Sequence, residues 1–419
     1  MTDRHGDSFR AKCHASSCRS CGATGLEPVL DLGLMPLSDG LVGDDQLHVE
    51  DTRYPLEVAF CPTCTLVQIL HTVEPEVLFC QDYPYYSSVI DTLMEHSRLN
   101  ALELIDRHQL GSDSLVMEIA SNDGYMLRNF AHRGIKVLGI DPAQGPVNEA
   151  IDVGVESLCA FFTSQLARRL RDDGLRPDII IANNVLAHVA DTNGFVEGIA
   201  LLLKDSGQAV IECPYVRDLV DNCEFDTIYH EHLCYFSLTA LDRLFVRHGL
   251  FINDIRHLNI HGGSLRIYVG KQEQRSEAVN RRIDDEQSAG VTSYGYYEQF
   301  SRRVEEIRIA LRRLMFDLRS SGYTIAAYGA PAKGTILLNY LGLENSCIPF
   351  TVDRNSRKQG KYVPGVRIPI RDTSELLIRM PDYTLLLPWN FKDEILRQQQ
   401  TYRSRGGRFI IPIPKPTIV

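Results

Sequence analysis

The sequence predicts an α/β protein with two doubly wound units and a small domain in front of them. Short apolar runs alternate with helical patterns in the first unit, over 76–272, and again in the second, over 321–419. This alternation is typical of parallel sheets covered by helices. A charged, helix-forming stretch over 273–320 separates the units, and we expect one long connecting helix there. Two Cys-x-x-Cys pairs indicate a small metal-stabilised domain over 1–75.

Composition narrows the function classes. The chain has 419 residues, a formal net charge of −10 and ordinary proportions of hydrophobic (44%) and charged (23%) residues. A chain with net negative charge is poorly suited to bind the phosphate backbone of a nucleic acid, so we expect no nucleic-acid partner. The polar N-terminus lacks the apolar core of a signal peptide, and no apolar run approaches the length of a membrane span. We therefore expect a cytoplasmic protein with no membrane partner.

The cysteine pairs are Cys18 with Cys21 and Cys61 with Cys64. Each pair offers two sulfurs on a tight turn, and four thiolates suit tetrahedral Zn²⁺. Since protein ligands fill all four positions, the predicted zinc site is structural. A redox role is the alternative for either pair taken alone.

The first unit contains a series of predicted strands. They cover 115–120, 137–141, a run ending at Gly154-Val155, 178–183 and 207–214, followed by an antiparallel pair at 251–260 and 264–271. Ligands of such sheets sit outside the carboxyl ends of the strands, so the turn after the first strand is a candidate site. Asp141, at the end of the second strand, is placed to bond a ribose diol.

The turn reads Glu118-Ile-Ala-Ser-Asn-Asp-Gly124 and lacks the Gly-x-Gly-x-x-Gly pattern of dinucleotide sites. It resembles the Glu-x-Gly-x-x-x-Gly turn of class I S-adenosylmethionine (AdoMet) methyltransferases, with alanine in place of the first glycine. A Rossmann-like turn that binds nothing is the alternative. The resemblance implies an AdoMet site made by the turn, by Asp141 and by two asparagines after the fourth strand: Glu118, Ala120, Ser121, Asn122, Gly124, Asp141, Asn183 and Asn184.

The second unit begins with predicted strands at 323–328, 348–353, 383–390 and 408–414. The turn Tyr328-Gly-Ala-Pro-Ala-Lys333-Gly is bracketed by glycines and carries one lysine, so it suits a diphosphate. A lysine that is merely solvated is the equal alternative. Tyr328 and Lys333 are thus candidate substrate contacts.

Titratable side chains cluster in Tyr229-His230-Glu231-His232, which follows the fifth strand. Such clusters are typical of working sites. His-Glu-His does not present its ligands on one face as His-Glu-x-x-His does, so acid/base chemistry is favoured over a metal. We expect the segment to lie across the cofactor pocket.

Taken in order, these motifs cover nearly the whole chain. They are the two cysteine pairs, Tyr83-Pro-Tyr-Tyr-Ser-Ser, Glu118-Ile-Ala-Ser-Asn-Asp-Gly, Asn184-Val-Leu-Ala-His188, Tyr229-His-Glu-His232 and Tyr328-Gly-Ala-Pro-Ala-Lys333. The chain resembles the zinc-containing sugar C-methyltransferases of deoxysugar biosynthesis. The resemblance implies a zinc domain, a central class I methyltransferase domain and a C-terminal Rossmann-like domain. It also implies methylation of C-3 of a nucleotide-linked 4-keto-6-deoxysugar, which we expect to be dTDP-linked, in deoxysugar and antibiotic biosynthesis.

Carried onto this sequence, the family's catalytic residues are Tyr83, His188, Tyr229, Glu231 and His232. A carbon beside a ketone must lose a proton before it accepts a methyl group, so the site needs a base and donors to the enolate oxygen. His232 is our first choice for the base because its ordinary pKa lies near neutral pH. Glu231 would hold its tautomer or act directly on the sugar, and Tyr229, Tyr83 and His188 would donate to the oxyanion or orient the ring.

Two other functions stay open at the level of sequence. An O- or N-methyltransferase needs less base catalysis and would leave the tyrosine, glutamate and histidine cluster underused. A noncatalytic scaffold that binds zinc and AdoMet belongs to another class. The oligomeric state is not predicted.

Overall fold

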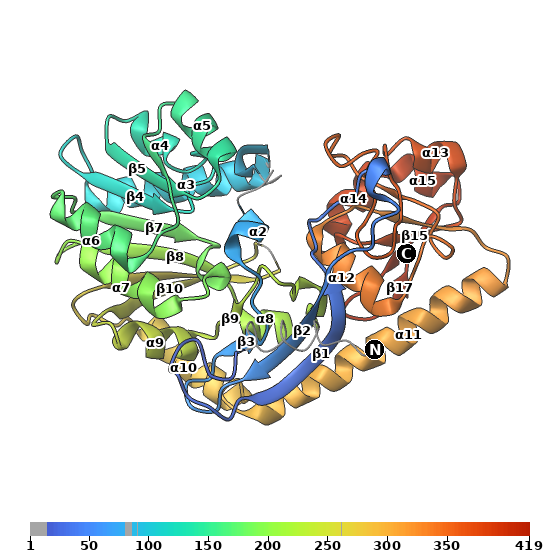
Figure 1. The fold of residues 1–419 in the computed structure, drawn as a ribbon, viewed down its shortest axis with the longest axis horizontal. Coiled ribbons are helices and arrows are strands. Elements are labelled where there is room, and N and C mark those ends of the chain that lie inside the picture. Colours follow the sequence, from blue (N-terminus) through green and yellow to red (C-terminus); the bar gives the residue numbers. More distant parts are fainter. Residues whose placement is uncertain (1–14, 80–85, 90, 261) are drawn as a thin grey trace, which may run out of the picture.

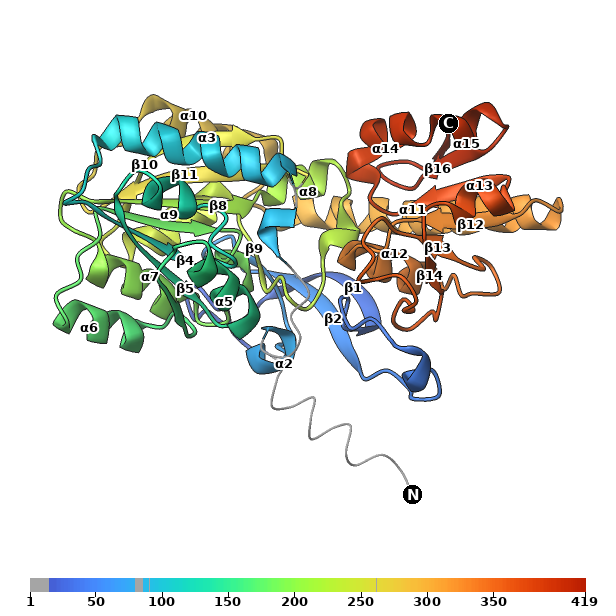
Figure 2. The same ribbon diagram turned by 90° about the horizontal axis from the view of Figure 1, so that it is seen from above.

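The computed structural model describes residues 15–79, 86–89, 91–260 and 262–419, and within these residues the chain forms three sheets. Figure 1 shows two α/β lobes side by side, with a long helix running beneath both and an N-terminal β-hairpin between them. Figure 2 shows from above how the tip of that hairpin reaches the C-terminal lobe. The Thr335 hydroxyl donates to the Ser38 carbonyl there, and the Gly365 amide donates to Asp51.

The first lobe is built on a seven-stranded sheet in the order β10-β11-β8-β7-β4-β5-β6. Its first five strands along the chain are parallel, and the β10–β11 pair is antiparallel, as the sequence predicts. The strands are β4 (Leu115–Ile119), β5 (Lys136–Asp141), β6 (Ser157–Cys159), β7 (Ile179–Asn183), β8 (Gln208–Pro214), β10 (Phe251–Leu258) and β11 (Ser264–Gly270).

One strand prediction in this lobe is wrong. The third strand was expected to end at Gly154-Val155, but β6 begins after these residues. The Val155 amide instead donates to the Ala150 carbonyl and closes the preceding helix, and Gly154 takes φ +82. The glycine is therefore a helix stop and not a strand end. The helices of the lobe are α3 (Asp91–His108), α4 (Arg128–Ala131), α5 (Gln144–Asp152), α6 (Ser164–Asp172), α7 (Thr192–Leu202), α8 (Val216–Asp221) and α9 (Leu238–Val246).

The N-terminal sheet is antiparallel and has the order β1-β2-β3-β9. Three strands lie close to one another in the sequence: β1 (Glu27–Pro36), β2 (Arg53–Phe60) and β3 (Val67–Ile69), and the short helix α2 (Pro75–Phe79) follows. The fourth, β9 (Cys234–Tyr235), comes from the middle of the chain and directly follows the histidine cluster. The predicted boundary of the zinc domain at residue 75 stays a prediction. The N-terminal sheet extends beyond that boundary, because it includes β9.

The connector is two helices and not one. α10 (Glu277–Ala289) ends at Gly290, which takes φ +82 and donates to the Gln287 carbonyl, and α11 (Tyr294–Ser320) begins a few residues later. A glycine in the left-handed region is a common helix terminator. α11 buries a stripe of apolar side chains against both lobes: Val304, Ile307, Leu311, Met315 and Leu318.

The C-terminal lobe has a six-stranded sheet in the order β14-β13-β12-β15-β16-β17, parallel except for β17. The order reverses on either side of β12, so the turns after β12 and β15 meet at the switch point, where ligands of open α/β sheets bind. The strands are β12 (Ile325–Tyr328), β13 (Thr351–Val352), β14 (Ile370–Arg371), β15 (Tyr383–Leu386), β16 (Arg408–Ile411) and β17 (Thr417–Ile418). The helices are α12 (Ala332–Leu341), α13 (Glu375–Arg379), α14 (Lys392–Gln398) and α15 (Gln400–Ser404).

No helix in the described part of the chain is both long enough and apolar enough to cross a membrane.

Candidate active site and zinc centre

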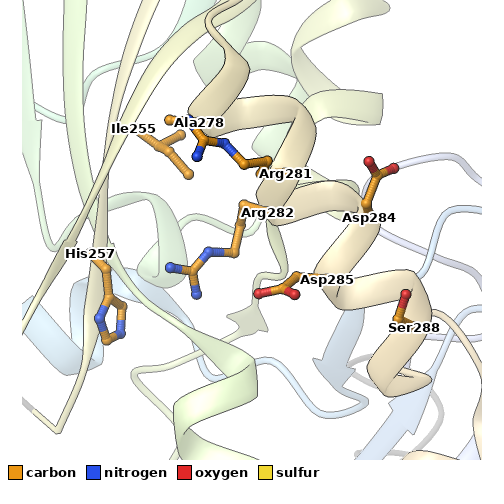
Figure 3. Close-up of a pocket in the computed structure, with 8 residues that line it drawn as sticks. All are labelled: Ile255, His257, Ala278, Arg281, Arg282, Asp284, Asp285 and Ser288. Atoms are coloured by element: carbon orange, nitrogen blue, oxygen red, sulfur yellow. The ribbon is translucent and has the colours of Figure 1, made fainter.

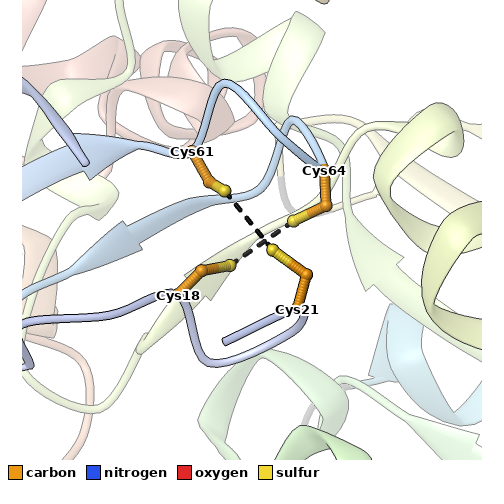
Figure 4. A group of neighbouring side chains, drawn as sticks. All are labelled: Cys18, Cys21, Cys61 and Cys64. Carbon is orange, nitrogen blue, oxygen red and sulfur yellow. Dashed lines mark hydrogen bonds between the residues drawn. The ribbon is translucent and has the colours of Figure 1, made fainter. Parts of the chain in front are cut away.

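The four predicted zinc ligands come together at the base of the N-terminal sheet (Figure 4). Their sulfur atoms all lie within 4.8 Å of one another, with Cys18 3.4 Å from Cys64 and Cys21 3.6 Å from Cys61. Tetrahedral Zn²⁺ with bonds of about 2.3 Å separates its sulfurs by roughly 3.8 Å, so the cage fits the ion. The cysteines in the described residues form no disulfide, and this donor set favours zinc.

The first turn of the methyltransferase sheet has a strained backbone. Ala120, Asn122 and Gly124 take φ values of +58, +49 and +73. The amides of Ala120 and Ser121 donate to the Ile140 carbonyl, which ties the turn to β5. Positive φ in residues other than glycine is costly and concentrates at ligand sites.

Several polar atoms around this turn are buried without a hydrogen-bond partner among the described residues. They include the Ser121 hydroxyl, Asp123 Oδ1 and Asn183 Oδ1. Ser121 and Asp123 belong to the turn, and Asn183 ends the neighbouring strand β7. Buried polar atoms are normally paired, so the group of orphaned oxygens fits a polar ligand such as AdoMet.

Two carboxylates flank the turn in different ways. Asp141 accepts the Asn122 amide at one oxygen and the Ala143 amide at the other, each at 2.9 Å, so it braces the turn and keeps one lone pair per oxygen for a ribose hydroxyl. Glu118 is fully buried, and burial together with the charge of Asp141 raises its pKa well above the usual value. Asn184, beyond β7, has φ +53 and donates its amide to the Glu212 carbonyl.

The histidine cluster is held from two sides. On one side the Ile69 amide of β3 donates to the Leu233 carbonyl, and β9 continues the N-terminal sheet. On the other side the Leu233 amide donates to the Ala187 carbonyl in the turn η3 (Leu186–His188), which follows β7. The zinc domain and the carboxyl edge of the methyltransferase sheet thus position the segment together.

His232 has the geometry of a base. Its Nδ1 lies 2.8 Å from the carbonyl oxygen of Thr227. A carbonyl can only accept, so Nδ1 carries the proton and the neutral ring keeps its lone pair on Nε2. A backbone carbonyl thus binds the Nδ1 side of the ring, and the expected role of Glu231 in holding the imidazole stays a prediction. No side-chain pattern in the sequence could have pointed to that carbonyl.

Aromatic rings surround the imidazole. The Tyr229 ring centroid lies 4.1 Å from that of His232, and the His188 ring meets it edge-on at 4.8 Å. Burial and the neighbouring His232 lower the pKa of His188 to about 3, so His188 is neutral at physiological pH. Tyr83, the remaining predicted donor, lies outside the described residues.

Glu231 is buried, and burial raises its pKa to about 8, with a further rise from the charge of Asp39. Asp39 belongs to the connection between β1 and β2. Burial raises the pKa of Asp39, and the ammonium of Lys358, in the C-terminal lobe, acts in the opposite direction with a smaller effect. Glu231 is therefore protonated near neutral pH. Nothing in the sequence singled out Asp39 as its neighbour.

The two candidate substrate contacts in the C-terminal lobe lie at the switch point but are engaged by the protein. Lys333 Nζ donates to Asn390 Oδ1 at 2.5 Å and lies 4.0 Å from the centroid of the Trp389 ring. Tyr328 is buried, and its hydroxyl accepts from the Gln399 amide at 3.4 Å. The sequence could not reveal these partners, which lie far along the chain.

A separate hollow of about 510 Å³ opens beside α10 (Figure 3). Its arginines are already matched: Arg282 lies over the Tyr215 ring, and the acids Asp284 and Asp285 share the wall. His257, on β10, pairs with Asp218 at 2.6 Å. Among the described residues, Arg281 pairs with Glu277 and Asp285 pairs with Arg217.

Comparison with known proteins extends this description along the whole chain. A family model described as "Putative zinc binding domain" matches residues 18–79, one described as "Methyltransferase domain" matches 94–253, and one described as "C-methyltransferase C-terminal domain" matches 259–414. C-methyltransferase NovU of Streptomyces niveus is 36% identical over 405 residues, which cover 96% of both chains.

Two further matches cover only part of the chain. The ubiquinone biosynthesis O-methyltransferase of Bartonella tribocorum is 31% identical over 93 residues, 22% of this chain and 38% of that protein. The crystal structure of magnesium protoporphyrin IX methyltransferase from Synechocystis PCC 6803 with bound SAM is 14% identical, with a TM-score of 0.33, over 43% of this chain and 79% of that one.

The cysteine cage, the turn after β4 and the full-length match agree with one another. The chain has a class I methyltransferase fold with an N-terminal zinc domain, and it uses AdoMet and zinc. It belongs to the zinc-containing, AdoMet-dependent C-methyltransferase family.

Proposed function

We propose that the enzyme methylates C-3 of a nucleotide-linked 4-keto-6-deoxysugar, dTDP-linked, in deoxysugar and antibiotic biosynthesis. The observation that carries this proposal is the tautomer of His232. With Nδ1 bonded to the Thr227 carbonyl, the ring holds Nε2 as a proton acceptor among aromatic side chains. Oxygen and nitrogen acceptors already have a lone pair and need less base catalysis, whereas a carbon beside a ketone becomes nucleophilic only after a base removes its proton.

The 4-keto group explains the neighbours of His232. Removing the C-3 proton places negative charge on the ketone oxygen, and neutral donors in a buried site stabilise it. Tyr229 and His188, both in ring contact with His232, serve as these donors, with Tyr83 as a third in our proposal. AdoMet supplies an electrophilic methyl group, which the turn after β4 holds.

Glu231 acts as an acid and not as the partner of the imidazole in this scheme. Its raised pKa, about 8, keeps it protonated at neutral pH, so it donates a hydrogen bond to a sugar oxygen. Asp39 and Lys358 complete a polar wall to which all three domains contribute.

The nucleotide diphosphate needs exposed cations that it can reach from solvent. Lys333 donates to Asn390, whereas the loop after β13 carries two arginines that suit the diphosphate better. Arg354 and Arg357 are exposed there, and the Arg357 guanidinium lies 5.0 Å from the centroid of the Tyr86 ring, which precedes α3 of the first lobe. Two guanidinium groups suit a diphosphate.

Proton exchange tests the proposal directly. The enzyme is incubated in D₂O with dTDP-4-keto-6-deoxyglucose and without AdoMet, and deuterium at C-3 is measured by mass spectrometry. We expect exchange in the wild type, methyl transfer to the same carbon when AdoMet is added, and loss of both in His232→Asn with AdoMet affinity unchanged. His108→Asn is the matched control, because His108 bonds Gln208 at the amino end of β8. Methyl transfer to oxygen or nitrogen, or turnover that survives in His232→Asn, would refute the proposal.

A further inference from the structure

The turn η4 (Phe225–Thr227) joins the catalytic segment to the C-terminal lobe. Its Thr227 carbonyl accepts from His232, and its Asp226 side chain is fully buried. Asp226 Oδ2 accepts the indole N–H of Trp389 at 2.8 Å. Trp389 begins the 3₁₀ turn that follows β15, so η4 receives one hydrogen bond from the nearby His232 and one from a distant segment of the C-terminal lobe.

Hydrogen bonds and packing hold the turn η4 in place. The Thr227 amide and hydroxyl both donate to the Glu224 carbonyl, at 3.0 and 2.7 Å. Phe225 is fully buried, and its ring meets that of Tyr340, on α12, at 5.5 Å. A displacement of Asp226 therefore carries the Thr227 carbonyl with it.

Charge at this joint favours an ionised Asp226. Burial raises the pKa of Asp226 to about 6, and the Lys333 ammonium and the indole N–H act in the opposite direction. Lys333 lies over the same indole and is bonded to Asn390, so the lysine, the tryptophan and the carboxylate form one packed unit. This unit occupies the switch point of the C-terminal sheet, where the sequence alone predicted a ligand.

We propose that Asp226 and Trp389 are positioning residues for the catalytic base: the C-terminal lobe holds η4, and η4 holds the imidazole of His232 in its reactive tautomer. The inference rests on the proposed role of His232. It gives the C-terminal lobe a part in proton transfer in addition to substrate binding.

Trp389→Phe tests the inference, because it removes the N–H and keeps an aromatic ring beneath Lys333. We expect kcat to fall roughly tenfold, with KM for the sugar nucleotide and Kd for AdoMet within about twofold, since a loosened base affects the chemical step. The acid limb of the kcat profile should move to lower pH, because the bond to the Thr227 carbonyl favours the protonated ring.

Tyr402→Phe is the matched control. The Tyr402 hydroxyl donates to the Pro381 carbonyl inside the same lobe, away from η4. We expect Tyr402→Phe to lower the melting temperature and to leave the acid limb of the kcat profile at the same pH. If Trp389→Phe behaves as this control does, its role is structural and the inference is wrong.

Asp226 offers a second test with a conservative rescue. Asp226→Asn keeps an oxygen for the indole N–H, and Asp226→Ala keeps none. We expect the asparagine variant to retain kcat within about threefold and the alanine variant to lose it like Trp389→Phe. Equal losses in both variants would overturn the positioning role of the hydrogen bond.

A readout without substrate separates this inference from the proposed function. The ¹⁵N shifts of His232, assigned with His232→Asn, report which ring nitrogen carries the proton. We expect one tautomer in the wild type and a mixture in Trp389→Phe. If Trp389→Phe shows the same single His232 tautomer as the wild type, the inference is wrong. If the wild-type enzyme methylates none of the nucleotide keto sugars, only the proposed function is wrong.

Discussion

The two lobes of this enzyme share one local feature, a strand-to-helix turn at the first strand of a doubly wound sheet, and they use it differently. After β4, the Ser121 hydroxyl and Asp123 Oδ1 are buried without a partner among the described residues. After β12, the Ala330 amide donates to Asp353 and Lys333 donates to Asn390. The first turn presents free polar groups to a ligand, and the second has its groups bonded within the protein.

This difference teaches what a turn motif can predict. Both turns have the expected shape, with Gly124 at φ +73 and Gly329 at φ +87. A side chain at Gly329 would place its Cβ 2.5 Å from the Pro388 ring, so glycine is required there for packing as well as for conformation. Whether a turn binds a ligand depends on the residues around it.

Zinc removal should have the largest effect on activity. It should abolish the function of the catalytic segment and leave AdoMet binding at the turn after β4 nearly unchanged. β9 belongs to the zinc domain's sheet, so loss of the metal releases the segment that carries His232. We expect more than a hundredfold loss of methyl transfer on chelation, with AdoMet affinity within about threefold by calorimetry. Readdition of Zn²⁺ is the control, and equal loss of AdoMet binding would show that the two regions are not independent.

Lys333→Met should destabilise the protein without touching the cofactor. It leaves Asp226 without its cation, and an unpaired buried charge is costly, here about 1–3 kcal/mol because Lys333 is only partly buried. We expect a lower midpoint in guanidinium unfolding and unchanged AdoMet affinity. Lys392→Met, in an exposed part of α14, is the matched control. Weaker AdoMet binding in Lys333→Met would contradict the idea that only the turn after β4 serves the cofactor.

Ser121→Ala should weaken AdoMet binding and leave the stability of the protein unchanged. The hydroxyl has no partner in the described protein, so its loss leaves the melting temperature of the ligand-free enzyme within about 1 °C. Loss of one hydrogen bond to the cofactor weakens AdoMet binding roughly three- to tenfold. A stability loss with unchanged affinity would mean that the first turn, too, is bonded internally.

The smallest effect concerns pH. Burial raises the pKa of Glu224 to about 8, and Asp226, Asp218 and Lys333 face it from η4, α8 and α12. The folded state therefore binds a proton that the unfolded chain releases near pH 4.5, so this group's contribution to the free energy of unfolding falls as pH rises from about 4.5 to 8. Glu224→Gln should flatten this slope in guanidinium unfolding between pH 5.5 and 8.5, whereas exposed Glu344→Gln should retain it.

Much of the architecture could be predicted from local pattern. Ten strands follow the predicted apolar runs: β4, β5, β7, β8, β10, β11, β12, β13, β15 and β16. The misplaced third strand and the break at Gly290 are both helix ends marked by glycine. The prediction failed there because a single glycine is compatible with a strand end, a helix stop or a bend until its φ angle is known. The zinc site could be predicted from the spacing of its four cysteines alone.

The sequence by itself determined which groups the protein carries: four thiolates, a turn that resembles an AdoMet site, and a cluster of two histidines, one carboxylic acid and one tyrosine. Only the tertiary structure decided how they are used. It set the tautomer of His232 through the Thr227 carbonyl, paired β9 with the zinc domain and bonded Lys333 within the joint beside Asp226. The physical reason is that side-chain identity and spacing are local, whereas hydrogen-bond partners, burial and pKa depend on residues brought together from distant parts of the chain.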